Sequence, residues 1–288
     1  MKTKKKSHTE MNVVLVVGAS SGFGKACAEK LSAQGYRVFA ASRSARPNQS
    51  VAVDATAGGL VPLNMDVQSD DSVASAVETV IRTCGRIDVV INSAGIAYAG
   101  SVEDTSMNEF RDQLETNFFG VVRVTRAVLP QMRKQGNGLF INISSIGGLI
   151  GLPFQSAYSA SKFALEGFTE SLRHEVRPFG IKALLLEPGD FKTNMTLNRK
   201  FSKGNDPESP YYDACKAAIE TTIAGEVSGQ SPELLAHKVA ALIHYEAPAV
   251  RYSCGPVMQR VAARAKGWLP EKIFERLIAQ EFEQIHNK

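Results

Sequence analysis

The chain has 288 residues, of which 44% are hydrophobic, and this is enough material for one large core. Its formal net charge of +4 is concentrated at the start, where residues 1–10 hold four lysines and one glutamate, so the rest of the chain is almost neutral. This distribution excludes the broad basic surface of a nucleic-acid-binding protein and predicts a disordered basic tail over residues 1–10.

The four cysteines show no spacing typical of a metal site, and the five histidines are scattered along the chain. We therefore expect a cytoplasmic protein with reduced cysteines and no bound metal. The apolar stretch Val13–Val17 follows the basic tail but is too short for a signal sequence. No run of eighteen apolar residues occurs, so no transmembrane segment is predicted.

The folded part opens with a pattern that favours dinucleotide binding. Val13–Val17 is typical of a buried strand, and Gly18-Ala19-Ser20-Ser21-Gly22-Phe23-Gly24 and a helix to about Ala33 follow it. A strand, a glycine-rich turn and a helix in this order begin a dinucleotide-binding βαβ unit. The glycines allow the backbone to approach a pyrophosphate, and the first turn of the helix offers N–H groups to its charge.

The end of the second predicted strand, Tyr36–Ala41, bears on the choice of cofactor. The strand runs into Ser42 and Arg43, with Arg46 close behind and no acidic residue. An acid at this place binds the ribose 2′-hydroxyl of NAD, whereas arginine matches the 2′-phosphate of NADP. The alternative is a solvated arginine at a strand end. The sequence favours NADP(H).

The next segment continues the alternation of strands and helices. Residues 44–59 lack helical periodicity and are expected to form a loop. Strands are predicted at Leu60–Met65 and Ile87–Ile91, and an amphipathic helix at Ser69–Thr83 lies between them. The small residues of Asn92-Ser93-Ala94-Gly95 would allow a flat ring to lie close to the backbone.

A long helical pattern from about Met107 to Lys134 is interrupted at Asn117-Phe118-Phe119-Gly120. Asparagine is disfavoured inside a helix unless its amide makes a specific contact. Asn117 is therefore either a functional residue or a hydrogen-bonded amide of the core.

The central stretch of the chain places a serine, a tyrosine and a lysine close together. A buried strand, Leu139–Ile143, is followed by Ser145, a glycine-rich loop and a helix over Ser156–Val176. Tyr158 and Lys162 are four residues apart and share one face of this helix. An isolated Tyr-x-x-x-Lys is typical of a surface pair. Beside a lysine ammonium, however, a tyrosine pKa falls from its reference value of about 10, and the hydroxyl becomes a usable general acid or base.

The last third of the chain completes the pattern. A strand is predicted at Ile181–Leu186, and residues 189–229 are mostly irregular with short helical patches and form a candidate lid. A helix at Pro232–Tyr245 and a strand at Val250–Ser253 follow, and then two helices within 256–286. The apolar stripe of the last helix fits the core, a subunit contact or a membrane surface.

Strands and helices alternate from end to end. We therefore predict a single doubly wound (Rossmann) α/β domain over residues 11–288, with a parallel sheet of about seven strands and helices on both faces. Residues 255–288 would be a C-terminal helical extension.

The chain resembles the short-chain dehydrogenase/reductase (SDR) family over about residues 12–253. The motifs that carry the resemblance are, in order, Gly18-x-x-x-Gly22-x-Gly24, Asp66, Asn92-x-Ala94-Gly95, Asn117, Ser145, Tyr158-x-x-x-Lys162 and Pro188-Gly189 with Thr193. Val17 and Ser93 replace a threonine and an asparagine that are usual in the family. The segments 147–154 and 161–167 are similar to the 17-beta-hydroxysteroid and retinol dehydrogenase-like branch.

The resemblance implies roles for the matching residues. Tyr158 would be the proton donor or acceptor, Lys162 would lower its pKa and hold the nicotinamide ribose, Ser145 would orient the substrate oxygen, and Asn117 would hold a water. The expected cofactor-binding residues are Gly18, Ser20, Ser21, Gly22, Phe23, Gly24, Ser42, Arg43, Asp66, Val67, Asn92, Ala94, Gly95, Tyr158, Lys162, Pro188, Gly189, Phe191 and Thr193. The helices that carry Asn117 and Tyr158 would join subunits, so a homodimer or homotetramer is expected.

The residues expected to contact the substrate are Ser145, Leu149, Phe154 and Met195. The last three are apolar, and no arginine or lysine stands out in the loop after Ser145 to bind a phosphate or carboxylate. We expect an NADP(H)-dependent oxidoreductase that interconverts a secondary alcohol and a ketone on a bulky hydrophobic substrate, such as a hydroxysteroid, retinoid or lipid. A reductase of 3-oxoacyl thioesters or other small carbonyls remains an alternative. A non-catalytic NADP(H)-sensing module is disfavoured by the intact serine, tyrosine and lysine.

Overall fold

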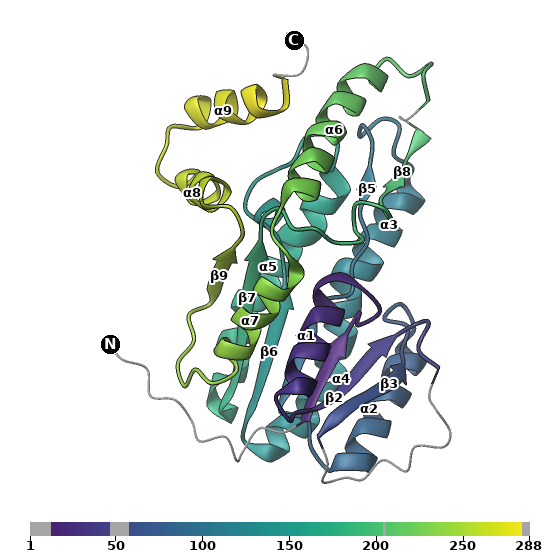
Figure 1. Cartoon of the computed structure of the whole chain (residues 1–288), viewed down its shortest axis with the longest axis vertical. Helices are drawn as coiled ribbons and strands as arrows, with labels where there is room; N and C mark the ends of the chain where they lie inside the picture. Colours follow the sequence, from purple (N-terminus) through teal and green to yellow (C-terminus); the bar gives the residue numbers. More distant parts are fainter. Residues whose placement is uncertain (1–12, 47–57, 204–205, 284–288) are drawn as a thin grey trace.

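The computed structural model describes residues 13–46, 58–203 and 206–283 (Figure 1). Seven parallel strands form one sheet in the order β3-β2-β1-β4-β6-β7-β9, with helices on both faces. This is the predicted doubly wound α/β architecture. The predicted tail over residues 1–10 and most of the loop predicted at 44–59 lie outside the described residues.

The boundaries of the elements agree with the predicted ones to within a few residues for most of the chain. The strands of the large sheet are β1 (Val13–Val17), β2 (Arg37–Ser42), β3 (Gly59–Asn64), β4 (Val89–Asn92), β6 (Gly138–Ile143), β7 (Ile181–Pro188) and β9 (Arg251–Cys254). The helices that cover it are α1 (Gly22–Ala33), α2 (Asp70–Cys84), α4 (Gly120–Gln135), α5 (Ser156–Val176) and α7 (Pro232–Leu242).

The central strand β1 is buried on both faces, which is why its sequence is one continuous apolar run. Side chains alternate along a strand, so Val14 and Val16 pack in a core with residues of α1 and α7. Leu15 packs on the other face, in a core with Val77 of α2 and Val128 of α4. Each face of the sheet therefore has its own hydrophobic core.

The strand order places a crevice at the carboxyl end of β1. This strand pairs with β2 on one side and with β4 on the other. The chain runs outward from β1 to β2 and β3, and then returns to β4 and runs outward the other way. The two crossovers leave β1 and β4 in opposite directions, and doubly wound proteins bind their ligands at this switch point.

The predicted interruption of the long helix is present. The helix α3 (Met107–Leu114) passes through a turn of π-helix, Glu115–Phe119, into α4. A π-helix inserts an extra residue per turn and is often found at functional sites. Asn117 lies in the middle of this turn.

The segment predicted as mostly irregular, 189–229, differs from the expectation of short helical patches. It contains α6 (Tyr212–Ser228), a continuous helix that buries Cys215 and Ile219. A Cβ on Gly225 would lie 2.2 Å from Oδ2 of Asp190, so a larger residue there would displace the Asp190 side chain. A small sheet of β5 (Tyr98–Ala99) and β8 (Lys200–Phe201) was also not predicted.

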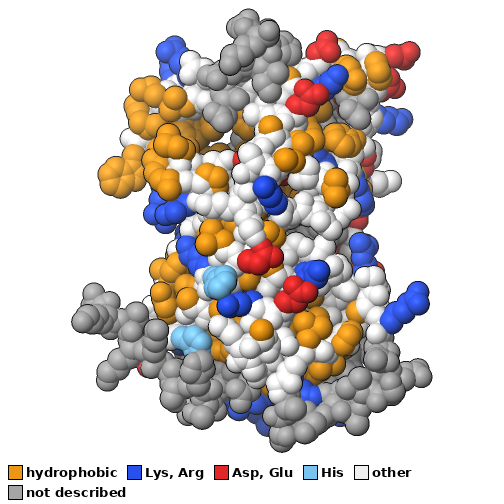
Figure 2. All heavy atoms as spheres, in the orientation of Figure 1, with side chains coloured by type: hydrophobic (Ala, Val, Ile, Leu, Met, Phe, Trp, Pro, Cys, Tyr) orange, Lys and Arg blue, Asp and Glu red, His pale blue; other side chains and the backbone are white. Residues whose placement is uncertain are grey.

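The last two predicted helices are present as α8 (Val257–Ala265) and α9 (Glu271–Glu283), which lie beside the main body (Figure 1). The apolar stripe of α9 is divided, because Phe274 is buried whereas Ile273 and Leu277 are half exposed. Hydrophobic side chains gather on the surface over α8 and α9 (Figure 2). In the part of the chain that the structure describes, no helix is long and apolar enough to cross a membrane. All four cysteines are free thiols.

Candidate active site

The glycine-rich turn between β1 and α1 forms a tightly packed cradle. Gly18 has a φ of +85°, and a Cβ there would lie 2.5 Å from the backbone nitrogen of Ala94. A Cβ on Gly24 would lie 2.2 Å from the carbonyl oxygen of Gly18. Only glycine fits at these two positions, because the backbone of the turn packs against itself and against the segment after β4.

The N-terminus of α1 faces this turn. Ser21 is the N-cap residue, and its side chain makes no capping hydrogen bond to the helix. The first N–H groups of α1 and the positive end of the helix dipole are therefore available to an anion. This arrangement fits the pyrophosphate of a dinucleotide.

A cavity of about 420 Å³ extends from the turn along the carboxyl ends of the strands. It contains thirteen of the residues predicted to bind cofactor or substrate: Gly18, Ser20, Ser21, Gly22, Phe23, Ser42, Arg43, Asp66, Val67, Ala94, Gly95, Thr193 and Met195. Asp66 is the one carboxylate among the described residues that line it, whereas Arg43 and Lys200 supply positive charge. The lining therefore fits an anionic ligand such as a dinucleotide.

The position of Arg43 agrees with a role at the edge of this cavity. The residue is exposed, and its carbonyl oxygen accepts a hydrogen bond of 2.9 Å from Nδ2 of Asn64. The same Asn64 amide donates to the carbonyl oxygen of Ala45 at 3.3 Å. Asn64 thus fixes the backbone of the turn after β2, and this turn carries the exposed Arg43 side chain.

Several predicted cofactor residues lie outside the cavity lining. Gly24 packs under the glycine turn. Asn92 is buried and donates from Nδ2 to Oδ1 of Asn142 at 2.8 Å. Gly189 donates its N–H to the carbonyl oxygen of Cys254, and Phe191 is buried edge-on against Phe23 with ring centroids 5.1 Å apart. Pro188 is the last residue of β7. These residues support the walls of the cavity.

Ser145, Tyr158 and Lys162 lie together where β6 leads into α5. The Ser145 hydroxyl accepts a hydrogen bond of 3.0 Å from the N–H of Gly147. Lys162 is buried, its Nζ donates to the carbonyl oxygen of Ile143 at 2.9 Å, and it lies 5.7 Å from the centroid of the Tyr158 ring. Three of the four predicted catalytic groups therefore meet at the carboxyl end of one central strand.

The pKa of Tyr158 differs from the expectation. Burial raises the pKa above its ordinary value, and a hydrogen bond with Ser145 opposes this effect. Lys162 was expected to lower the pKa of Tyr158. The lysine instead donates a hydrogen bond to the Ile143 carbonyl, and burial disfavours its charged form. Burial lowers the pKa of Lys162 to about 8, and Glu166 opposes this shift. For both groups the largest cause of the pKa shift is desolvation by burial, which disfavours the charged form.

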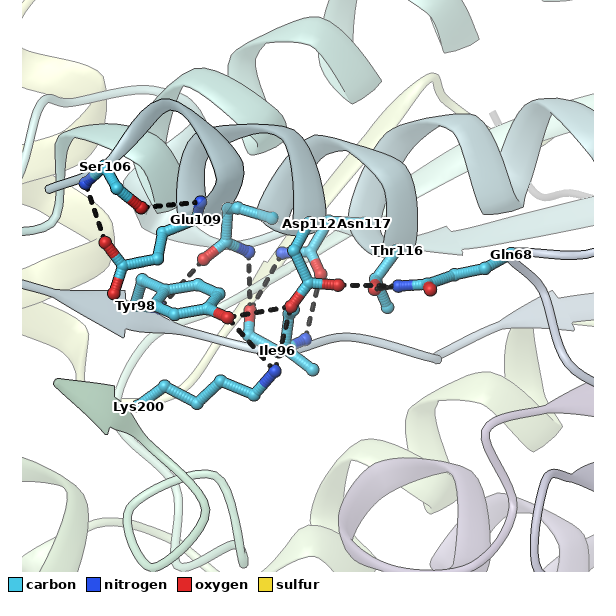
Figure 3. Close-up of polar contacts among 10 residues, drawn as sticks. Gln68, Ile96, Tyr98, Ser106, Glu109, Asp112, Thr116, Asn117 and Lys200 are labelled. Carbon is cyan, nitrogen blue, oxygen red and sulfur yellow. Dashed lines mark hydrogen bonds and ion pairs between the residues drawn. The ribbon is translucent and has the colours of Figure 1, made fainter. Parts of the chain in front are cut away.

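The Asn117 side chain is fully used in holding the loop after β4 (Figure 3). Its Oδ1 accepts from the N–H of Ile96 at 2.9 Å, and its Nδ2 donates to the carbonyl oxygen of Ile96 at 3.0 Å. Nδ2 also donates to the hydroxyl of Ser161 at 3.1 Å. The π-helix turn thus ties the loop beside the cavity to the helix of Tyr158. A role for Asn117 in holding a water stays a prediction.

A polar network that the sequence analysis missed joins segment 189–229 to α3 (Figure 3). The Asp112 carboxylate accepts hydrogen bonds from the Tyr98 hydroxyl, from Nζ of Lys200 and from Nε2 of Gln68, at 2.8–2.9 Å. Gln68 and Lys200 line the cavity. The partners lie far apart in the chain, so no local pattern could have revealed them. Other unpredicted residues of the lining are Val17, Met65, Ser93, Ile96, Ala97, Thr116, Asn194 and Asn198.

The predicted substrate residues lie on different sides of the catalytic groups. Met195 lines the cavity, and its Cε would lie 4.0 Å from a Cβ on Gly95. Phe154 has a φ of +55° and packs against a small apolar cluster that includes Cys215 and Ile219 of α6. Leu149 is half buried, and its carbonyl oxygen accepts a hydrogen bond from Lys266.

A buried ion pair near Tyr158 was also not predicted. Nη2 of Arg199 lies 2.6 Å from Oε1 of Glu226 on α6. Glu226 raises the pKa of Tyr158 and Arg199 lowers it, so both charges are close enough to act on the hydroxyl. Among the described residues, no cluster of histidine, cysteine or acidic side chains could hold a metal ion.

Comparison with known proteins shows the family to which the chain belongs. The sequence profile of the short chain dehydrogenase family matches residues 12–203. The chain is 41% identical over 263 residues to the 3-ketodihydrosphingosine reductase of Bacteroides thetaiotaomicron, which covers 91% of this chain and 95% of that protein. It is 33% identical over 250 residues to dehydrogenase/reductase SDR family member 7B of Danio rerio, which covers 80% and 81%. The crystal structure of a short-chain dehydrogenase from Streptomyces avermitilis superimposes with a TM-score of 0.77 and 34% identity, over 96% of this chain and 98% of that one.

Proposed function

Because the chain belongs to the short-chain dehydrogenase/reductase family of oxidoreductases, we propose that it uses NADP(H) to interconvert a ketone and a secondary alcohol on a bulky hydrophobic substrate. The observation that carries this proposal is the meeting of Ser145, Tyr158 and Lys162 at the end of β6, in a fold whose glycine-rich turn opens into a cavity at the carboxyl ends of the strands. Among hydrophobic substrates we favour a ketone on a long alkyl chain, since the bacterial relative is named for reduction of 3-ketodihydrosphingosine.

The proposed chemistry assigns one task to each residue. NADPH supplies the hydride when it is bound. The Tyr158 hydroxyl donates its proton to the oxygen of the reduced carbonyl, and in the reverse direction the phenolate takes that proton back. The Ser145 hydroxyl donates a hydrogen bond to the same oxygen and stabilises the charge that develops on it. Lys162 is held by the Ile143 carbonyl, and its ammonium favours the phenolate form of Tyr158.

The preference for NADP(H) rests on the end of β2. Arg43 lies at the rim of the cavity, and no acidic residue of the described chain stands at that point to bind a free 2′-hydroxyl. A guanidinium forms paired hydrogen bonds with a phosphate, which a neutral ribose hydroxyl cannot match.

The substrate would lie between the loop after Ser145 and segment 189–229, which we propose as a lid. Met195 of the lid lines the cavity, and Phe154 packs against Cys215 and Ile219 of α6, which is part of the lid. The network of Asp112, Tyr98 and Lys200 anchors the lid at β8. This arrangement supports an apolar substrate better than a phosphorylated or sugar-like one.

Two surfaces support contacts with partners. Phe119 beside α4 and Phe163 on α5 are 45% and 40% exposed, and we propose that these helices form a homodimer or homotetramer interface. We propose that α8 and the turn after it touch an anionic membrane surface. Trp268 is 91% exposed there, and residues 257–269 hold Arg260, Arg264 and Lys266 but no acid.

The experiment that tests the function follows NADPH oxidation with long-chain ketones, steroid ketones, retinoids, 3-oxoacyl thioesters and hydrophilic sugars. We expect the highest kcat/KM with a long-chain ketone. A clear preference for thioesters or sugars over every hydrophobic ketone would contradict the proposal.

A further inference from the structure

The ion pair of Arg199 and Glu226 is unusual in its hydrogen bonds. Both carboxylate oxygens of Glu226 accept one, whereas two nitrogen donors of Arg199 have no partner among the described residues. The side chains are 1% and 14% exposed. Oε1 of Glu226 accepts from Nη2 of Arg199, and Oε2 accepts from the Thr196 hydroxyl, each at 2.6 Å. In contrast, Nε and Nη1 of Arg199 have no hydrogen-bond partner among the described residues. Buried donors in native proteins are almost always paired, so these N–H groups call for a partner.

Both residues of the pair belong to segment 189–229, the proposed lid, and lie near the catalytic groups. The neighbours of Arg199 in the chain, Asn198 and Lys200, both line the cofactor cavity. Thr222 is one turn before Glu226 on α6 and accepts a hydrogen bond of 3.3 Å from Gln155, three residues before Tyr158. The electrostatic effects of both charges on Tyr158 agree with this location. Arg199 itself lies behind the cavity lining, between two residues that belong to it and within electrostatic range of Tyr158.

The charge of the pair restricts what its partner can be. Arg199 and Glu226 together are neutral, so a bound carboxylate or phosphate would leave an uncompensated negative charge in the interior. An ammonium group would face the guanidinium and be repelled. A neutral oxygen, such as that of a hydroxyl or a carbonyl, accepts from Nε and Nη1 without adding charge.

We propose that Arg199 binds a neutral oxygen acceptor of the substrate, a hydroxyl or second carbonyl near the reacting carbon, and so sets the substrate specificity of the enzyme. This inference deepens the proposed function and rests on it. The enzyme would select ketones that carry a polar head beside the reacting carbon and an apolar tail beyond it. A plain alkyl ketone would leave the two donors unpaired and would be a poorer substrate.

The test uses two ketones that differ by one hydroxyl, 1-hydroxyoctadecan-3-one and octadecan-3-one, each with NADPH. The unmodified enzyme should prefer the hydroxyl-bearing ketone by at least about tenfold in kcat/KM, since a site built to bind a hydroxyl discriminates against its absence. Arg199→Met should remove this preference by lowering kcat/KM for the hydroxyl-bearing ketone, mainly through KM. Arg199→Lys should restore part of it. The control, Arg111→Met on the exposed face of α3, should change neither value.

A second variant guards against loss of folding. Arg199→Met leaves Glu226 unpaired in the interior, whereas Arg199→Met/Glu226→Gln removes both charges together. This double variant should fold and bind NADPH like the unmodified enzyme, and should still lose the preference.

The outcomes separate this inference from the proposed function. Reduction of both ketones with equal losses in every Arg199 variant, or no preference in the unmodified enzyme, would overturn the inference alone. Reduction of neither ketone by the unmodified enzyme would overturn the proposed function and the inference together.

Discussion

Lys162 on α5 is joined to Ile143 at the end of β6 by a hydrogen bond of 2.9 Å from Nζ to the carbonyl oxygen. The bond fixes the helix that carries Tyr158 to a strand in the middle of the sheet. It also holds the buried ammonium of Lys162 beside Tyr158. The pKa of Lys162, at about 8, lies close to neutral pH. The charge of Lys162 is therefore sensitive to its surroundings.

The first prediction concerns Tyr158. Tyr158→Phe removes the transferable proton, and turnover should fall by at least about a hundredfold, as is usual for a general acid. NADPH should bind with nearly unchanged affinity, as measured by its fluorescence. Tyr211→Phe is the matched control, because Tyr211 is a surface tyrosine bonded to Glu103. A loss below tenfold in Tyr158→Phe would rule out the catalytic assignment.

The second prediction concerns the pH dependence of activity. The Lys162 ammonium is present below its pKa of about 8, so activity should fall as the pH rises through this value. Glu166 raises the Lys162 pKa, and a Cβ on Gly148 would lie 3.2 Å from the side chains of both residues. Glu166→Gln should therefore lower that pKa and move the alkaline limb of kcat/KM to lower pH.

Glu170→Gln is the control for this shift. Glu166 and Glu170 both pair with Arg251. Glu170 lies on the exposed side, and its charge is not among the causes that shift the pKa of Lys162. An alkaline limb at the same pH in Glu166→Gln and in the unmodified enzyme would be evidence against the coupling.

The third prediction concerns the cofactor. Arg43→Ala should weaken NADPH by about ten- to a hundredfold, since charge-assisted hydrogen bonds contribute about 1.5–3 kcal/mol. The affinity for NADH should change little, because NADH lacks the 2′-phosphate. Binding constants for both cofactors by calorimetry measure this difference, with Arg111→Ala as the control. Equal kinetic constants for NADPH and NADH in the unmodified enzyme would show that the cofactor proposal is wrong.

The fourth prediction concerns the surface of α8 and the turn after it. Trp268 is the single tryptophan of the chain, so its fluorescence reports on this surface alone. Vesicles containing phosphatidylserine should shift the emission to shorter wavelength, and vesicles of phosphatidylcholine should shift it less. Each nearby basic residue contributes about 1 kcal/mol to binding an anionic surface. Met258→Asp should reduce the shift, and an emission unchanged by either vesicle would refute the membrane contact.

The fifth prediction concerns assembly. Light scattering at micromolar concentration should give a mass of at least twice the 31.2 kDa of one chain. Phe119→Asp with Phe163→Asp should shift the protein toward the monomer, because both changes place a charge in the proposed interface. Val102→Asp, at an exposed apolar position outside these helices, should leave the mass unchanged. A monomer mass for the unmodified protein would disprove the proposal.

The sequence by itself determined the fold and the family, and both predictions are confirmed. The features behind them are local. Val13–Val17 is apolar because its strand is buried on both faces, and the glycines after it stand where a Cβ would strike the backbone. Tyr158 and Lys162 share a helix face because they are four residues apart. Each of these signals depends on a few neighbouring residues.

Only the tertiary structure decided which distant groups meet. Lys200 reaches Asp112 across 88 residues, and Arg199 reaches Glu226 across 27, with no pattern in the sequence to indicate either pair. The sequence suggested a lowered pKa for Tyr158 from its spacing to Lys162, but the folded chain raises it through burial. Hydrogen bonds, desolvation and charge pairing depend on distances in space, and these distances exist only after the sheet and its helices have packed.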